Sequence, residues 1–206
     1  EEIGLGARVE TFKGWVGTPE CRDALKSCDV LFGCTDDHDG RMLINRLAYF
    51  YLIPVFDIGI GIDYVDESPP RITLADSRVT VLEPGNRCLL CRGVVDPKIA
   101  QENDLLRRNP EEYYRLRERG ELYVRGGGRP NPAVVTFTTG VACMAVDELV
   151  HRLTGYRPAG SVAHRVYKHR LLEEKRPGPR AVLCRLCIEQ NYWGRGDMEP
   201  FLDRTG

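Results

Sequence analysis

The sequence lacks the features that mark membrane-spanning or nucleic-acid-binding proteins. No apolar run approaches the roughly 18 residues of a membrane-spanning helix. Basic residues are not in excess, because 29 Lys and Arg stand against 30 Asp and Glu for a formal net charge of −1. Proteins that bind nucleic acids or membrane surfaces usually carry a clear basic excess, so we expect neither partner. An internal repeat and a low-complexity block are also absent. The 206 residues suffice to bury the core of one domain without disulfide staples.

The first residues carry no recognisable targeting signal. Residues 1–4 have neither a basic stretch nor an apolar core, so they do not predict a signal peptide. The sequence does not begin with Met, which agrees with a processed chain or a piece of a longer one. Residues 4–6 start like a phosphate-binding G-x-G-x-x-G, but Val9 replaces the third glycine. The pattern also precedes a predicted strand, residues 7–12, so we interpret it as a helix-capping glycine turn.

Eight cysteines would suit disulfides in a secreted protein, but their spacing argues against that interpretation. Four of them form two C-x-x-C pairs, which is the metal-binding spacing of cytosolic proteins. A chain of this length also needs no disulfides to be stable. We therefore expect a cytoplasmic protein.

The two pairs, Cys88 with Cys91 and Cys184 with Cys187, predict one structural zinc ion. The sulfurs of a C-x-x-C turn can face one point, each about 2.3 Å from the metal. Two such pairs complete a tetrahedron, and four thiolates leave no open position for catalysis. A dithiol redox centre and buried thiols without a metal are the alternatives.

The flanking sequence suits two zinc knuckles, at residues 84–91 and 179–187. Pro84-Gly85 precedes the first pair and Pro177-Gly178-Pro179 the second, as expected of tight turns. The pairs are 96 residues apart, so a shared metal would close a long loop and tie the last segment to the rest of the fold.

An apolar run of strand length, residues 29–34, ends in a polar cluster, residues 35–39. A run that is apolar throughout suits a strand buried on both faces, as in a parallel sheet. Apolar residues then recur at helical spacing over residues 40–52, and a second strand follows at residues 53–59. Strand, helix and strand with short connections form a βαβ unit. The sequence therefore predicts an α/β fold with a Rossmann-like, mostly parallel sheet.

The remainder of the chain predicts a mixed β segment, a crossover and a long helix. Residues 72–82 suit one or two short strands. Residues 92–130 are polar and charged and predict a long, mobile crossover loop with a helical stretch at residues 111–119. A second helix is expected at residues 133–153, and a strand at residues 162–172 leads to the second cysteine pair. We treat the whole chain as a single domain.

Asp36, Asp37 and Asp39 gather three carboxylates at the end of the first predicted strand. Open α/β sheets bind their ligands at the carboxyl ends of strands, and carboxylates can hold the Mg²⁺ of a nucleoside triphosphate. The alternative is that Asp and Thr side chains cap the following helix, and composition alone slightly favours it. His38 is expected to be a loop or capping residue rather than a ligand.

Several of these motifs follow one another in a fixed order. They are Asp29-Val-Leu-Phe-Gly-Cys-Thr-Asp36-Asp37, Arg41-Met-Leu-Ile-Asn45, Ile53-Pro54-Val55, Arg78-Val-Thr-Val-Leu-Glu-Pro-Gly85, the first cysteine pair, Leu153-Thr154-Gly155 and the second cysteine pair. In this order the sequence resembles the ThiF/MoeB/HesA family of adenylating enzymes, which are related to ubiquitin-activating enzymes. The resemblance extends from about residue 20 to residue 190.

The resemblance implies an enzyme that uses ATP and Mg²⁺ to adenylate the C-terminal glycine carboxylate of a ubiquitin-like or sulfur-carrier protein. AMP is a good leaving group, so a sulfur nucleophile can then take the acyl group. By the same resemblance, Asp36 is the catalytic residue beside the phosphates and the metal, with Thr35 and Asp37 next to it. A carboxylate that holds Mg²⁺ neutralises and orients phosphate, which is electrostatic catalysis.

The chain also departs from the family pattern. Only 33 residues precede Cys34, and they do not supply the G-x-G-x-x-G turn, the acidic residue for the ribose, or the arginines and lysine for the phosphates. We therefore expect the C-terminal portion of such an enzyme, inactive by itself. Residues 92–130 contain no cysteine for a thioester, and we do not expect Cys21, Cys28 or Cys143 to be the nucleophile.

Two other functions remain open, a non-catalytic interaction scaffold and an adenylating enzyme that acts on a small peptide. The resemblance further implies a homodimer. Residues 40–52 are apolar nearly all round the predicted helix, and such a helix is normally buried on more than one side. Either a second copy or a missing N-terminal half would cover it.

Overall fold

The computed structural model describes residues 6–69, 71–122, 134–180 and 184–198. Outside the described residues therefore lie residues 4 and 5 of the expected glycine turn and residues 123–130 of the predicted crossover. The elements are α1 (Pro19–Lys26), β1 (Leu31–Gly33), α2 (His38–Phe50), β2 (Val55–Val65), β3 (Arg71–Leu82), α3 (Pro97–Arg108), α4 (Pro110–Glu118), α5 (Val135–Thr154), β4 (His164–Lys168), β5 (Glu173–Lys175), α6 (Arg185–Ile188), and the 3₁₀ helices η1 (Gln190–Tyr192) and η2 (Gly196–Met198).

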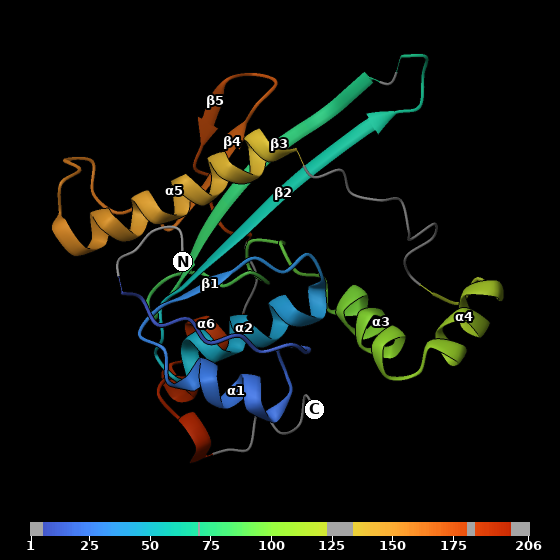
Figure 1. Cartoon of the computed structure of the whole chain (residues 1–206), viewed down its shortest axis with the longest axis horizontal. Coiled ribbons are helices and arrows are strands. Elements are labelled where there is room, and N and C mark those ends of the chain that lie inside the picture. Colours follow the sequence, from blue (N-terminus) through green and yellow to red (C-terminus); the bar gives the residue numbers. More distant parts are fainter. Residues whose placement is uncertain (1–5, 70, 123–133, 181–183, 199–206) are drawn as a thin grey trace.

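A five-stranded mixed sheet in the order β1-β2-β3-β4-β5 forms the centre of the fold. The α/β class expected from the sequence is confirmed. The β1–β2 pair is parallel, as the βαβ unit requires, whereas the other described pairs are antiparallel, so the sheet is mixed and not mostly parallel as expected. Figure 1 shows the long β2–β3 ribbon with α5 lying along it on one side and α2 on the other.

The βαβ unit forms where the sequence predicts it, with α2 connecting β1 to β2. The parallel register pairs Leu31 with Val55 and Gly33 with Asp57. Most apolar residues of α2 are buried in one core with β1, the start of β2 and the cysteine-bearing turns. The protein thus covers α2 by itself, so this helix offers no broad apolar face to a second copy. The apolar residues of this helix therefore give no structural support to the expected homodimer.

The alternation of side chains along β2 divides the interior into two cores. Ile58 and Ile60 point toward α5, where they pack with Met144 and with the buried residues Val79, Val141 and Ala145. Successive side chains of a strand point to opposite faces, so Asp57, Gly59 and Gly61 face away from α5. The second core, around α2, lies on that other face.

The long helix α5 ends where the sequence predicts, at Gly155. This glycine has a φ of 66°, in the left-handed region, and its N–H donates to the carbonyl of His151 at 2.7 Å. Glycine adopts this conformation without the strain that a Cβ would cause, so it ends helices efficiently. Among the described helices, none combines the length and apolar character that crossing a membrane would require.

Two expectations from the sequence were wrong. Residues 7–12 are exposed and form no strand, because no described strand lies beside them to complete a ladder. The described part of the predicted crossover loop contains α3, which was not expected, and α4, which confirms the helical stretch predicted at residues 111–119. Each starts with an acid or amide cap followed by proline: Asp96 accepts from the Lys98 amide at 2.8 Å and Asn109 from the Glu112 amide at 3.2 Å. Such caps and a proline in the first turn favour a helix in a polar sequence.

Candidate functional site

The four cysteines of the two C-x-x-C pairs come together in space. Their sulfur atoms all lie within 4.8 Å of one another, with Cys88 and Cys184 at 3.5 Å and Cys91 and Cys187 also at 3.5 Å. A tetrahedron of sulfurs about 2.3 Å from zinc has edges of about 3.8 Å, whereas a disulfide needs about 2.05 Å. The arrangement therefore fits a shared metal ion better than a pair of disulfides.

Helix α2 positions the first pair. The side-chain oxygen of Asn45 accepts from the Leu89 amide at 2.9 Å, and the Tyr49 hydroxyl donates to the Asn86 carbonyl at 2.8 Å. Both side chains are fully buried. Within the turn, the Arg92 amide donates to the Cys88 carbonyl at 3.1 Å. The sequence motif contained Asn45, but its part in holding the cysteine turn becomes visible only in the structure.

The second pair lies at the start of α6, directly after the segment that leads from the sheet. The Ile188 amide donates to the Cys184 carbonyl at 3.2 Å, which closes the turn between the two cysteines. The Trp193 ring nitrogen donates to the Leu186 carbonyl at 3.2 Å. The Arg180 amide donates to the Cys91 carbonyl at 2.8 Å, so the two turns are also joined by backbone.

The cysteine cluster is electrostatically suited to a divalent cation. A hydrogen bond from Cys88 lowers the pKa of Cys187 to about 5, and the same contact together with burial raises the pKa of Cys88. Burial raises the pKa of Cys91 to about 11. Without a metal, these shifts favour a thiolate at Cys187 beside protonated thiols at Cys88 and Cys91. A bound zinc ion would allow all four to ionise, because a coordinating thiol is deprotonated.

The structure assigns different environments to the aspartates of the polar cluster. Asp37 is the N-cap of α2 and accepts a hydrogen bond from the Gly40 amide. Asp39 pairs with Arg107 at 3.0 Å, although burial raises its pKa. Asp36 is exposed, and its side chain makes no hydrogen bond or ion pair with the residues that the structure describes. The helix-cap interpretation thus holds for Asp37, and Asp36 is left available to a ligand.

The other polar residues of this cluster also differ. His38 accepts from the Asp96 amide at its Nδ1, at 3.0 Å, and its backbone amide donates to Asn103 at 3.0 Å. Burial lowers the pKa of His38, so it serves as a neutral structural residue that joins α2 to α3. The hydroxyl of Thr35 is buried and finds no partner among the described residues.

A cavity of about 560 Å³ lies beside the carboxyl end of β1. Thr35 and Asp37 line it, together with Trp15, Cys21 and Cys28. Asp36 is not among its lining residues. The three residues that the resemblance assigned to the nucleotide therefore lie next to one another, but only two of them face this cavity.

Asp36 and Asp37 should respond differently to removal of the carboxylate. Asp37→Ala is expected to lower the free energy of unfolding by about 1 kcal/mol, because it removes the α2 cap. Asp36→Ala should change it by no more than about 0.5 kcal/mol, because no described contact is lost. Urea denaturation of the two variants measures this difference, and equal destabilisation would contradict the assignment.

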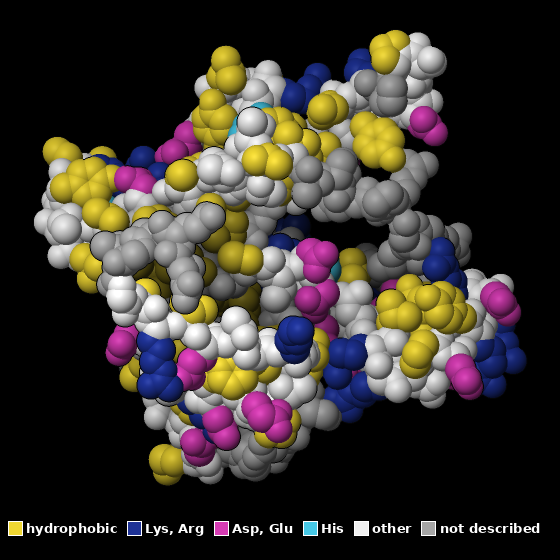
Figure 2. Space-filling view, in the orientation of Figure 1, with side chains coloured by type: hydrophobic (Ala, Val, Ile, Leu, Met, Phe, Trp, Pro, Cys, Tyr) yellow, Lys and Arg dark blue, Asp and Glu magenta, His cyan; other side chains and the backbone are white. Residues whose placement is uncertain are grey.

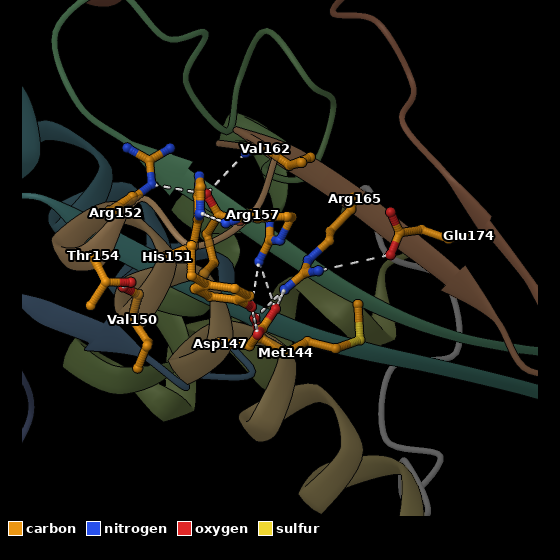
Figure 3. Close-up of polar contacts among 12 residues, drawn as sticks. Met144, Asp147, Val150, His151, Arg152, Thr154, Arg157, Val162, Arg165 and Glu174 are labelled. Carbon is orange, nitrogen blue, oxygen red and sulfur yellow. Dashed lines mark hydrogen bonds and ion pairs between the residues drawn. The ribbon is translucent and has the colours of Figure 1, made fainter. Parts of the chain in front are cut away.

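A second polar network, not anticipated from the sequence, joins α5 to the segment that enters β4. Glu148 is fully buried and accepts from Arg152 at 3.0 Å, from Arg157 at 2.8 Å and from the Val162 amide at 2.9 Å. Figure 3 shows Arg152 and Arg157 reaching into this network beside Val162. The network fixes the chain between α5 and β4, and we assign it a structural role.

Comparison with protein families matches residues 1–185 to the ThiF family. The match includes the polar cluster and three of the four clustered cysteines, and it ends just before Cys187. None of the curated proteins matches the chain. Since the family match spans most of the sequence, the chain belongs to the ThiF family.

Proposed function

We propose that this chain acts in an ATP-dependent enzyme that adenylates the C-terminal carboxylate of a ubiquitin-like or sulfur-carrier protein. Membership of the ThiF family suggests an adenylyltransferase-type enzyme. The observation that supports the proposal within the structure is the exposed carboxylate of Asp36 just after β1, next to Asp37, whose own carboxylate caps α2.

Asp36 suits a role beside a metal-bound nucleotide. Mg²⁺ prefers oxygen ligands and is commonly held by one or two carboxylates together with phosphate oxygens. When bound, Mg²⁺–ATP would supply the α-phosphate that the substrate carboxylate attacks, and pyrophosphate would leave as the acyl-adenylate forms. Asp36 would orient the metal, and Thr35 has a buried hydroxyl without a described partner that could serve the same ligand. Asp37 would act indirectly, by fixing the start of α2.

We further propose that Cys88, Cys91, Cys184 and Cys187 hold one structural zinc ion. The support is the distance between their sulfurs, which suits tetrahedral coordination, and the burial of three of the four side chains. Four thiolates leave no position for a substrate, so the metal would stabilise the fold and take no part in the reaction.

A cytoplasmic homodimer completes the proposal. The dimer rests on the resemblance to the family, because the apolar residues of α2 are covered within the chain. A different helix offers a contact surface: on α5, Val146, Val150 and Leu153 are 51%, 43% and 77% exposed along one face. Figure 2 shows hydrophobic side chains gathered on the left of the view, where α5 ends.

The catalytic role of Asp36 is tested by ATP–pyrophosphate exchange in the complete protein. Asp36→Ala is expected to lower the exchange rate by about 100-fold or more, the usual effect of removing a group that stabilises developing charge. Asp29→Ala is the matched control, because Asp29 is also exposed but precedes β1 at its opposite end. Exchange near the wild-type rate in Asp36→Ala would contradict the role. No exchange in the complete wild-type protein would favour the scaffold, unless a small peptide restores it.

A further inference from the structure

The sheet face that lies opposite α5 has an unusual combination of side chains. The antiparallel register of β2 and β3 pairs Asp57 with Thr80, Gly59 with Arg78 and Gly61 with Asp76. The two glycines place no side chain of β2 on this face. A Cβ at Gly59 would come within 2.5 Å of the Arg78 guanidinium, so glycine is what lets Arg78 lie across the strand.

A cavity of about 430 Å³ lies over these glycines, and three arginines from separate elements line it. Arg41 comes from the second turn of α2, Arg78 from β3 and Arg92 from the end of the first cysteine turn. His164 of β4 also lines the cavity and shares a hydrogen bond of 2.9 Å with the Thr80 hydroxyl. Burial, with smaller effects of Arg92 and Arg78, lowers the pKa of His164 to about 4, so its ring is neutral near pH 7.

One buried carboxylate forms ion pairs with two of the arginines. Asp57 is fully buried and lies 2.5 Å from an Arg78 nitrogen and 3.4 Å from Nε of Arg41. Arg41 also donates to the Ile58 carbonyl at 3.4 Å. These distances leave the Arg41 guanidinium weakly held, and its Nε is buried without a hydrogen-bond partner among the described residues.

Among the described residues, the third arginine donates its side-chain hydrogen bonds to carbonyl groups. Arg92 donates to the carbonyls of Arg87 and Pro177 at 3.3 and 3.2 Å, and the described residues include no carboxylate paired with it. The thiolates of a zinc-bound cysteine cluster would offset part of its charge, because Arg92 follows Cys91 directly. The remaining acid at the cavity, Asp76, already lies 3.7 Å from Lys168.

The charges that face the cavity are therefore unequal. Three arginines and the carboxylate of Asp76 line the cavity, and the groups paired with them behind it are the carboxylate of Asp57 and the Lys168 amine. Half-buried guanidinium groups without a full set of anionic partners are unfavourable, because they have lost water without gaining compensation. An anion in the cavity would restore the balance through charge-assisted hydrogen bonds, and a planar guanidinium binds carboxylate and phosphate well.

We propose that the cavity over Gly59 and Gly61 binds an anionic group, a carboxylate or a phosphate, between Arg41, Arg78 and Arg92. The site is separate from Asp36 and does not depend on the proposed adenylation. The glycines supply room for the group, and the three elements that carry the arginines supply its partners from different sides.

Titration of the chain with pyrophosphate and, separately, with succinate tests this site and distinguishes the two sources of negative charge. Isothermal titration calorimetry gives the affinity, and the amide resonances of Gly59 and Gly61 in NMR spectra report whether the anion enters this cavity. Saturable binding of either anion that shifts both amides is the expected result. Preference for one anion identifies the ligand as a phosphate or as a carboxylate.

Two variants and one control connect the binding to the arginines. Arg92→Gln should weaken binding about tenfold or more, because a hydrogen bond to a charged group contributes roughly 1.5–3 kcal/mol. Gly59→Ala should also weaken it, by displacing Arg78 without removing a charge. Arg71→Gln is the control. Arg71 lies on β3, as Arg78 does, but it is exposed and pairs with Glu67. The proposal is overturned if neither anion binds to the wild-type chain, or if both variants bind as tightly as the control.

Discussion

Replacing Cys88 with Ser is expected to unfold most of the chain at 25 °C. Structural zinc sites contribute apparent binding free energies of about 10–16 kcal/mol, which equals or exceeds the roughly 5–15 kcal/mol stability of a typical domain. Cys88 is fully buried in the main core, beside Leu89 and the packed face of α2. A hydroxyl there would weaken the metal site and remove the metal-mediated connection between the two cysteine turns. Circular dichroism and urea denaturation measure the loss.

Cys143→Ser is the matched control for this substitution. Cys143 is exposed on α5 and lies in a different element from the cysteine cluster. Its replacement should change the free energy of unfolding by about 0.5 kcal/mol or less, as most surface substitutions do. If Cys88→Ser were as stable as Cys143→Ser, the four cysteines would be packed thiols and the structural role of a metal would be wrong.

Glu148→Ala is expected to lower the free energy of unfolding by about 3–5 kcal/mol. Removing one partner from a buried charged network is strongly destabilising, although here Arg152 would keep its contact with Glu83 and Arg157 its contact with Asp147. In this protein the substitution would leave Arg152 and Arg157, each less than one-fifth exposed, and the buried Val162 amide without their shared acceptor. Urea denaturation at neutral pH measures the effect.

The control for Glu148 lies next to it on the same helix. Asp147 also contacts Arg157, at 2.7 Å, but its side chain is 43% exposed, so water can replace the lost contact. Asp147→Asn should therefore cost about 1 kcal/mol or less. Similar losses from the two substitutions would show that burial does not set the strength of this network.

Local patterns in the sequence predicted the elements whose determinants are local. The βαβ unit follows from an apolar run, a helical spacing and a second apolar run, and Gly155 marks the end of α5. The C-x-x-C spacing likewise predicted that the four cysteines gather. The helical stretch predicted at residues 111–119 corresponds to α4, whereas α3 was not predicted, although its cap, Asp96-Pro97, is present in the sequence.

The rest of the site depends on contacts between distant residues, which a single sequence does not reveal. The pairing of Asp57 with Arg78 requires the register of β2 against β3. Asp36 and Asp37 are equally good helix caps by residue type. Which of them caps α2 depends on which carboxylate the backbone directs toward the α2 amides. The predicted strand at residues 7–12 had a suitable pattern, but strand formation needs a neighbour.

The metal content of the purified chain tests the central claim most directly. Elemental analysis by mass spectrometry should find one zinc ion per chain, retained in Cys143→Ser and lost from Cys88→Ser. The cluster geometry, with all four sulfurs within 4.8 Å of one another, predicts this stoichiometry. A folded wild-type chain that contains no zinc, and whose Cys88, Cys91, Cys184 and Cys187 remain free thiols, would contradict the claim.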